Sequence, residues 1–122
     1  MNIQSTIHVL AVANLERTAI FYRDVLGFTI HEMNDSGWQM FEKEGCRIMA
    51  GHCPDATPAS ELGDHSYFGY FVVDNVDKYY ASVLSKGAEI TKQLKNEPWK
   101  MREFGVKTID GHRLMIGQDL AK

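Results

Sequence analysis

Carboxylates and histidines are the side chains of this 122-residue chain that could transfer protons or bind a metal ion. Glu42, Glu44 and Glu103 are candidates for proton transfer, but the sequence identifies no nucleophile or base to partner them, so they give weak support for catalysis. Glu42 and Glu44 are more simply explained as solvated charges at strand edges. His8 lies in an apolar run, where it could bind a metal ion or lie at the surface near a strand end.

The other histidines and the two cysteines form no standard metal-binding pattern. His52 and Cys53 could join Cys46 in a site for a soft metal, but their spacing fits no known motif, and ordinary loop residues are the simpler explanation. The two cysteines also provide no disulfide framework, which fits a reducing cytoplasm. The remaining histidines are scattered over a strand, a linker and a turn: His31, His65 and His112.

Aromatic and polar residues around Trp99 favour binding over catalysis. In the extended run that follows it, Phe104 and Val106 share one face and are expected to pack under a helix. The opposite face would line a groove with Trp99 at its mouth, although Trp99 could equally anchor a loop. On that face, Glu103 could attract a cationic group. The groove-lining residues of this run are expected to be Met101, Glu103, Gly105 and Lys107.

These residues belong to a sequence that repeats itself. The run Gly111–Ile116 (GHRLMI) resembles Gly45–Ala50 (GCRIMA), which lies 66 residues earlier. Upstream, Asn14 and Asn75 each follow an apolar run and precede a segment that ends at a glycine. Self-similarity on this scale predicts a duplicated supersecondary unit.

The first unit, residues 1–50, is predicted to fold in the order β-α-β-β-β. Asn14 is the expected N-cap of a helix that ends at Gly27. The apolar face of this helix is expected to contain Leu15, Ile20, Phe21, Val25 and Leu26. The strands are expected at Ile7–Val12, Phe28–Met33, Trp38–Lys43 and Cys46–Ala50.

The second unit, residues 68–122, is predicted to repeat this order after a linker at residues 51–67 that contains Pro54 and Pro58. Its helix is expected at Asn75–Lys86, with Val76, Tyr79, Tyr80, Val83 and Leu84 facing inward. Its strands are expected at Phe68–Val73, Ala88–Thr91, Met101–Thr108 and His112–Gly117, with a loop at residues 93–100.

The predicted fold class is α+β, with two tandem β-α-β-β-β units whose mixed sheets form a half-open barrel. One helix covers only one face of each sheet, so the other face must pack elsewhere or form an apolar groove for a small ligand. An uncovered sheet face also predicts a homodimer. Whether the two units pair within a chain or swap between chains is left open.

Composition argues against several classes of partner. The net charge of −3 and the pI near 5.9 give no basic surface for nucleic acid or an anionic membrane. The first residues contain no cationic region or long apolar stretch, so we expect no signal peptide, no membrane span and a cytoplasmic location.

Several segments resemble the vicinal oxygen chelate superfamily, which includes glyoxalases, ring-cleaving dioxygenases and bleomycin-resistance proteins. The chain departs from that pattern at Lys100, where a glycine is usual, at Thr108–Ile109, where Asp-Pro is usual, and at Asn14, where aspartate is common. The segment around Trp99 is most similar to the bleomycin-resistance branch, whose equivalent tryptophan helps to line the pocket. The matching segments are Asn14–Leu15, Phe21–Phe28, Val73–Asp77, Pro98–Phe104 and Asp110–Leu114.

The resemblance also identifies where metal-dependent members place their ligands. These positions correspond to Ile7, Met49, Phe68 and Met115, and none of these side chains supplies the nitrogen or oxygen that Zn, Ni, Fe or Mn prefers. We therefore expect no metal and no other cofactor at this centre. In a strand, His8 would face away from the position of Ile7, unless the register is shifted by one residue.

The predicted function is metal-free binding of an aromatic or amphipathic organic compound, as the bleomycin-resistance branch implies. The alternatives are a glyoxalase-like lyase, isomerase or epimerase with an atypical ligand set such as His8 with Glu103, or a domain that binds little. Met49 and Met115 could instead fill the core, and Trp38 could form a second wall or pack on its sheet. The expected ligand-binding residues are Trp99, Met101, Glu103, Phe68, Tyr70, Met49, Met115, Ile7 and Trp38.

Overall fold

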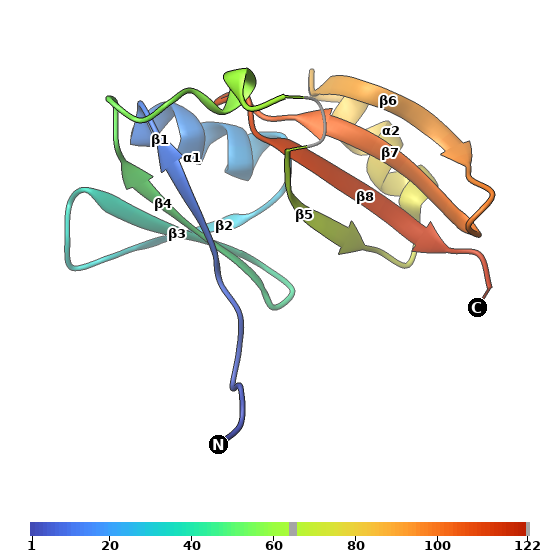
Figure 1. The fold of residues 1–122 in the computed structure, drawn as a ribbon, viewed down its shortest axis with the longest axis horizontal. Helices are drawn as coiled ribbons and strands as arrows, with labels where there is room; N and C mark the ends of the chain where they lie inside the picture. Colours follow the sequence, from blue (N-terminus) through green and yellow to red (C-terminus); the bar gives the residue numbers. More distant parts are fainter. Residues whose placement is uncertain (64–65, 122) are drawn as a thin grey trace. The chain divides into compact units, whose positions relative to one another are not determined.

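The structure is a computed structural model that describes residues 1–63 and 66–121. The chain divides into two compact units, Met1–Thr57 and Pro58–Lys122. Each contains an α-helix and a four-stranded mixed sheet, so the predicted repetition of the β-α-β-β-β order is confirmed (Figure 1). Asp64 and His65, which fall in the predicted linker, lie outside the described residues.

The first unit follows the predicted order of elements. Its sheet has the strand order β1-β4-β3-β2, with β1 parallel to β4 and the other neighbouring strands antiparallel. Strand β4 is longer than predicted and includes Gly51 and His52. The elements are β1 (His8–Val12), α1 (Leu15–Asp24), β2 (Thr29–Glu32), β3 (Trp38–Lys43) and β4 (Cys46–His52).

The second unit has the same connectivity, with the strand order β5-β8-β7-β6. Strand β6 continues to Asn96, so the prediction of a loop from residue 93 is wrong for Gln93–Asn96. The elements are a short 3-10 helix η1 (Ala59–Glu61), β5 (Tyr67–Val72), α2 (Val76–Ser85), β6 (Glu89–Asn96), β7 (Met101–Lys107) and β8 (Arg113–Asp119).

The core of the first unit lies between α1 and one face of its sheet. The Tyr22 ring stacks on Phe41 of β3, with 4.8 Å between the ring centroids. Thr18 and Ala19 are also buried on this side of α1, whereas Ile20 is exposed, so the predicted inward position of Ile20 is wrong. Thr18, Ala19 and Tyr22 have the spacing of one helical face, and that face, rather than residue type alone, decides which side chains are buried.

The core of the second unit is built in the same way. Val76 and Val83 of α2 are fully buried, and Tyr80 contacts the Phe104 ring of β7 edge to face at 5.0 Å. Leu84, which was predicted to face inward, is exposed, so the predicted inward position of Leu84 is wrong. The two helices therefore cover one face of each sheet and leave the other open.

Local sequence signals set the ends of the elements. The side chains of Asn14 and Asn75 accept hydrogen bonds from the backbone N–H groups of Arg17 at 3.0 Å and Lys78 at 3.1 Å. This confirms Asn14 as the predicted N-cap and shows that Asn75, expected as the first helical residue, is the N-cap of α2. The two repeated turn glycines, Gly45 and Gly111, have φ values of +86° and +88°. A side chain is disfavoured in this left-handed region, which explains why glycine occurs in both copies of the repeat.

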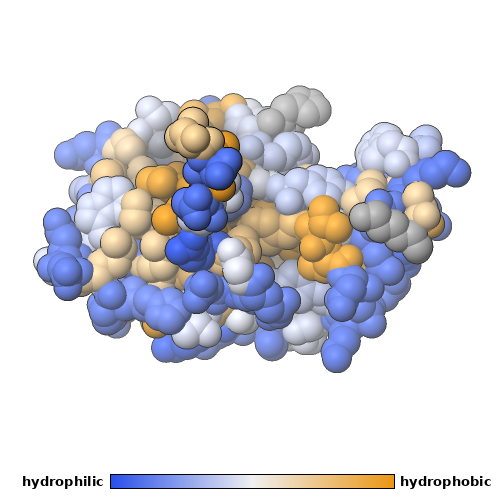
Figure 2. Space-filling model, turned by 90° about the horizontal axis from the view of Figure 1, so that it is seen from below, coloured by the Kyte–Doolittle hydropathy of each residue, from blue (hydrophilic) through white to orange (hydrophobic). Residues whose placement is uncertain are grey.

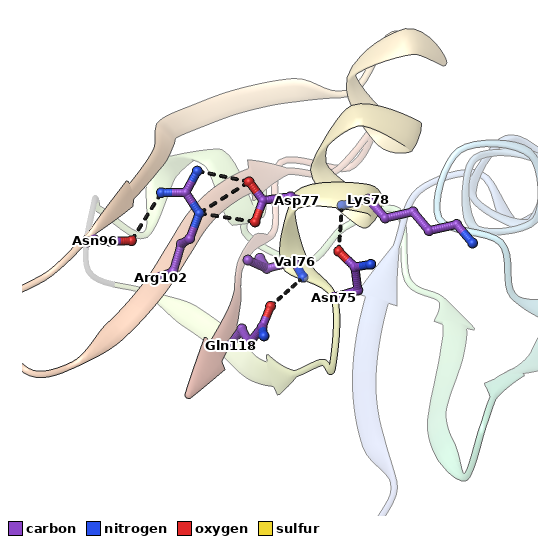
Figure 3. A network of polar contacts seen from close by, with 7 residues as sticks. All are labelled: Asn75, Val76, Asp77, Lys78, Asn96, Arg102 and Gln118. Atoms are coloured by element: carbon purple, nitrogen blue, oxygen red, sulfur yellow. Dashed lines mark hydrogen bonds and ion pairs between the residues drawn. The ribbon is translucent and has the colours of Figure 1, made fainter. Parts of the chain in front are cut away.

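The N-terminus of α2 is fixed to its sheet by side chains from three strands (Figure 3). The backbone N–H of Val76 donates to the Gln118 side chain of β8 at 3.0 Å. Arg102 of β7 donates to both carboxylate oxygens of Asp77, with a shortest distance of 2.9 Å, and to Asn96 of β6. These contacts satisfy a helix N–H that has no partner within the helix and complement the positive end of the helix dipole.

The ion pair at this helix end predicts a pH-dependent effect of Asp77→Asn. The Arg102 hydrogen bond and charge hold the pKa of Asp77 below its ordinary value of 3.8, against partial desolvation. A lowered pKa in the folded state stabilises the fold above the ordinary pKa, and this contribution is lost as the pH falls through the folded pKa. We therefore expect Asp77→Asn to lower the melting temperature at pH 7, with the difference from wild type shrinking as the pH falls below the ordinary pKa of 3.8. Thermal unfolding followed by circular dichroism from pH 7 to pH 2 measures it, and a difference that grows on acidification would contradict this account.

Neither α1 nor α2, the α-helices in the described part of the chain, is long and apolar enough to cross a membrane.

Candidate ligand-binding face

The uncovered face of the second sheet gathers most of the predicted groove residues. Along β7, Arg102 and Phe104 contact α2, so Glu103 and Gly105 point to the opposite side. Cross-strand pairing places Gly117 beside Glu103 and Met115 beside Gly105 on that side. We call this side of the β5-β8-β7-β6 sheet the open face.

Glu103 is the centre of a polar cluster on the open face. The residue is only 3% exposed. Its Oε1 atom accepts hydrogen bonds from the indole N–H of Trp99 at 2.7 Å and from the hydroxyl of Tyr70 at 3.2 Å. Two aromatic side chains from different segments are therefore held by one buried carboxylate oxygen.

Lys92 of β6 completes the cluster. Its ammonium group lies 3.2 Å from Oε2 of Glu103 and 5.4 Å from the centre of the Trp99 ring, within the range of a cation–π contact. The same ammonium lies 3.4 Å from Oε1 of Glu97, which Lys95 also approaches at 3.2 Å. These are ion-pair distances rather than those of well-directed hydrogen bonds. The open face therefore contains an alternating chain of two carboxylates and two ammonium groups.

The protonation of two groups follows from these contacts. Burial, together with the charge and hydrogen bond of Glu103, raises the pKa of Tyr70 to about 12, so its phenol is a neutral donor at physiological pH. Partial desolvation raises the pKa of Glu97, but Lys95 and Lys92 outweigh it and hold that pKa below its ordinary value. Both groups thus have fixed charge states near neutral pH.

The turn between β6 and β7 positions the Trp99 ring. The backbone N–H of Lys100 donates to the carbonyl of Glu97 at 3.0 Å, which closes a turn around Pro98 and Trp99. Lys100 follows with φ +64°, the left-handed conformation that favours glycine. This conformation suits the glycine that the family resemblance led us to expect at this position. The turn leaves Trp99 60% exposed while its N–H points back to Glu103.

Two glycines form the floor beneath these side chains. A Cβ atom at Gly117 would overlap the hydroxyl of Tyr70, so the phenol lies directly over that glycine. A Cβ atom at Gly105 would come within 2.5 Å of the Thr91 hydroxyl and 3.3 Å of the Met115 sulfur. The absence of side chains at these two positions therefore provides the space that Tyr70 and Met115 occupy.

The structure revises two of the expectations for this face. Glu103 was expected to attract a cationic ligand, but its carboxylate is buried and already paired with Lys92. Phe68 was expected beside Tyr70, but the pairing of β5 with β8 shifts between Tyr67 and Gly69, and the Phe68 ring contacts Phe71 and His112 edge to face. Such an irregularity interrupts the alternation on which the placement of Phe68 relied.

Met101 is the first residue of β7, where it is half-buried and paired with Asp119.

The first sheet has an uncovered face of its own, which carries the remaining predicted residues. Trp38 pairs with Gly51, and a Cβ atom at Gly51 would lie 2.7 Å from the Trp38 ring, so this ring packs flat on its sheet. Met49 pairs with Val9 and is half-buried. Ile7 precedes β1 rather than belonging to it, and its side chain is exposed. Trp38 thus lies on the uncovered face of the first sheet, which the sequence alone did not decide.

His8 lies on the helix side of the first sheet. It pairs with Ile48, which is fully buried on the same face as Phe41 and Tyr22, whereas Val9 pairs with Met49 on the uncovered face. The described residues contain no group of three or more His, Cys, Asp and Glu side chains that could hold a metal ion. Cys46, His52 and Cys53 accordingly form no such group.

Hydrophobic residues also form patches on the molecular surface. Figure 2 shows them in orange and tan between blue hydrophilic residues. Val9 on β1 and Val72 on β5 are exposed on the edge strands, each on the uncovered face of its own sheet. Both uncovered faces therefore combine apolar side chains with a tryptophan.

Lys92 and Glu97 are the members of the cluster that sequence reasoning missed. The strand was predicted to end at Thr91, which placed these residues next to or within a loop. They were therefore assigned to neither face of the sheet. The register of β6 shifts between Ile90, which pairs with Val106 on the helix side, and Lys92, which pairs with Gly105 on the open face. Simple alternation from Ile90 would therefore have placed Lys92 on the wrong side of the sheet.

Comparisons with known proteins agree with this fold. Residues 5–116 match the Glyoxalase/Bleomycin resistance protein/Dioxygenase superfamily. A comparison with curated proteins finds no match. Similar solved structures include TioX from Micromonospora sp. ML1, with 20% identity, a TM-score of 0.79, and 96% of this chain and 99% of that one covered.

Two further structures carry informative names. The bleomycin resistance determinant encoded on transposon Tn5 is 19% identical, with a TM-score of 0.78 and coverage of 96% and 98% of the two chains. TnmS3, an antibiotic binding protein from Streptomyces sp. CB03234, is 19% identical, with a TM-score of 0.77 and coverage of 97% of each chain. At these identities the likeness establishes the fold. The family match extends over nearly all of the residues from which both sheets are built, and the chain belongs to the Glyoxalase/Bleomycin resistance protein/Dioxygenase superfamily.

Proposed function

We propose that this protein binds an aromatic or amphipathic organic compound on the open face of its second sheet, without a metal ion and without transforming it. The main observation in support of this proposal is that two aromatic side chains, Trp99 and Tyr70, are exposed to solvent yet hydrogen-bonded to the same buried carboxylate. The antibiotic-binding and bleomycin-resistance names of two structural relatives support the same class of function.

Preorganisation is the physical basis of this proposal. An exposed tryptophan usually loses side-chain freedom when a ligand stacks on it, and this loss opposes binding. Here the Trp99 ring is already held by its N–H bond to Glu103 and by the neighbouring ammonium of Lys92. A flat ligand would then gain stacking energy without ordering the ring. Met115 lies beneath this face and is only 7% exposed, so it supports the floor more than it contacts the ligand.

The chemistry of the family's metal positions supports binding without a metal. Ile7 and Phe68 are hydrocarbon side chains, and Met49 and Met115 offer only thioether sulfur, which hard divalent ions bind poorly. Glu103 has its oxygens engaged by Trp99, Tyr70 and Lys92. A ligand on this face would therefore be held by stacking and hydrogen bonds.

This function predicts a metal-independent response in a screen of planar aromatic compounds. At about 100 times its dissociation constant, a ligand stabilises the fold by about 2.7 kcal/mol, which raises the melting temperature by several degrees. We expect the shift to be the same with and without a chelator. In a Trp38→Phe background, Trp99 is the remaining tryptophan, and its fluorescence should change on binding.

The matched control is Trp99→Ala in the same screen. The loss of Trp99 should remove the ligand-induced shift and lower the free energy of unfolding by about 1 kcal/mol, because the buried Glu103 carboxylate loses one of its hydrogen bonds. One tightly bound divalent ion per chain, found by elemental analysis, together with shifts abolished by the chelator, would refute the metal-free part of the proposal. The homodimer and the cytoplasmic location stay predictions from the sequence, and light scattering tests the first.

A further inference from the structure

We propose that the ligand of the open face carries an anionic group next to its aromatic ring, with Lys92 and Lys95 as the groups that recognise it. This inference rests on the proposed function and specifies its ligand class. It replaces the sequence-based expectation that Glu103 selects a cation.

Unequal exposure of opposite charges is the first reason. The carboxylates of Glu103 and Glu97 lie beneath the surface, with side-chain exposures of 4% and 7%. The ammonium-bearing side chains above them are more accessible, at 26% for Lys92 and 64% for Lys95. A ligand that approaches the Trp99 ring therefore meets positive groups first and negative groups only through them. Coulomb energy falls with distance, so the nearer charges have the larger effect.

The hydrogen-bonding partners of Glu103 and Lys92 are the second reason to expect an anionic ligand. Glu103 already accepts from Trp99 and Tyr70 and pairs with Lys92, so it offers little to a cationic ligand. The Lys92 ammonium is paired with both Glu103 and Glu97, but its side chain stays 26% exposed and lies 5.4 Å from the centre of the Trp99 ring. Because an ammonium group only donates hydrogen bonds, it suits a carboxylate, sulfonate or phosphate next to that ring. A cation at the same place would be desolvated without an acceptor.

The other charged residues of the open face do not reverse this preference. Lys107 and Arg113 form a cross-strand pair at one end of the sheet, on the same side as Gly105, and the exposed Glu89 of β6 pairs with Lys107 there. Asp119 lies at the other end, paired with Met101. Tyr70 adds no negative charge, because its pKa of about 12 keeps the phenol protonated. The accessible charge on this face is thus mainly positive, although the whole chain carries −3.

A matched series of naphthalene probes tests the charge preference. The probes are 1-naphthylacetate, 2-(1-naphthyl)ethanol and 2-(1-naphthyl)ethylammonium, which share the ring and differ in the charge of the side arm. Isothermal titration calorimetry at pH 7 should give the anion an affinity about tenfold above that of the alcohol, as expected for a hydrogen bond to a charged group, with the cation weakest. Raising the salt concentration should weaken binding of the anion and leave the alcohol unchanged.

Lys95→Gln provides the variant and Lys78→Gln the control. Lys95 is exposed at the rim of the open face. Removing its charge should weaken binding of the anionic probe about threefold and leave the affinity for the alcohol unchanged. Lys78 lies in α2 on the other side of the sheet, and the same charge change there should alter neither affinity. Equal affinities for all three probes, or a preference for the cation, would overturn this inference and leave the proposed function standing. Failure of all three to bind would overturn both.

Discussion

Replacing Glu103 by alanine is expected to lower the free energy of unfolding by about 3 kcal/mol, because it removes one partner from a buried ion pair. The change leaves the indole N–H of Trp99, the hydroxyl of Tyr70 and the ammonium of Lys92 without their shared acceptor. Lys92 is partly exposed and keeps Glu97, which limits the cost. Urea unfolding measures the change, and the same variant should lose binding of aromatic probes because the Trp99 ring is no longer fixed.

Two variants separate the roles of Glu103. Glu103→Gln keeps the shape and one acceptor oxygen but loses the charge, so it should cost roughly half as much as alanine. Glu89→Ala, at the exposed start of β6, changes the same residue type on the same sheet and should stay within about 0.5 kcal/mol of wild type. A loss below about 1 kcal/mol for Glu103→Ala would show that the cluster is not a supporting element of the fold.

The fold could be predicted from sequence because its signals are local and occur twice. Asn14 and Asn75 cap helices, and Gly45 and Gly111 adopt left-handed turns, so each signal reflects a backbone requirement that both copies share. A misplaced helix face, as at Ile20 and Leu84, did not change the order of elements. Burial there depends on the packing of a whole face against the sheet, which residue type alone does not determine.

The candidate site could be predicted only as far as strand alternation holds. Alternation correctly placed Glu103 opposite Phe104 and the helix. It did not apply to Phe68, which lies at an irregularity in β5, or to Lys92, which lies at another in β6. An irregular residue changes which of the following side chains share a face of the sheet. The contacts beyond it depend on how the strand pairs with its neighbour, and the sequence of one strand does not contain this information.

The two sheets also show why the repeat is uninformative about the site itself. Trp38 pairs with Gly51 in the first sheet, and Glu103 pairs with Gly117 at the matching position of the second. In the first sheet the aromatic ring covers the glycine from the neighbouring strand β3, whereas in the second Tyr70 covers it from β5. The duplicated backbone thus keeps a glycine beneath an aromatic ring, while the side chain that reaches it comes from a different strand.

Gly117→Ala is therefore expected to destabilise the protein by about 2 kcal/mol, the typical cost of overpacking. The added methyl group would overlap the Tyr70 hydroxyl and lie 3.1 Å from Cβ of Glu103. The backbone at Gly117 does not adopt a positive φ, so the cost comes from the contact and not from backbone strain. Displacement of Tyr70 from Glu103 should also bring the pKa of the phenol back from about 12 toward its ordinary value of 10, which an ultraviolet pH titration detects.

A double-mutant cycle with Tyr70→Phe isolates that contact. The phenylalanine lacks the hydroxyl that the new methyl group would overlap, so Gly117→Ala should cost about 1 kcal/mol less in the Tyr70→Phe background than in wild type. Gly37→Ala is the control, because its Cβ would meet only the Asp35 side chain, at 3.3 Å, in a turn whose Asp35 and Ser36 are exposed. Equal costs of Gly117→Ala in both backgrounds would mean that Tyr70 does not rest on the glycine, and its ring could then no longer be counted as a fixed wall of the ligand-binding face.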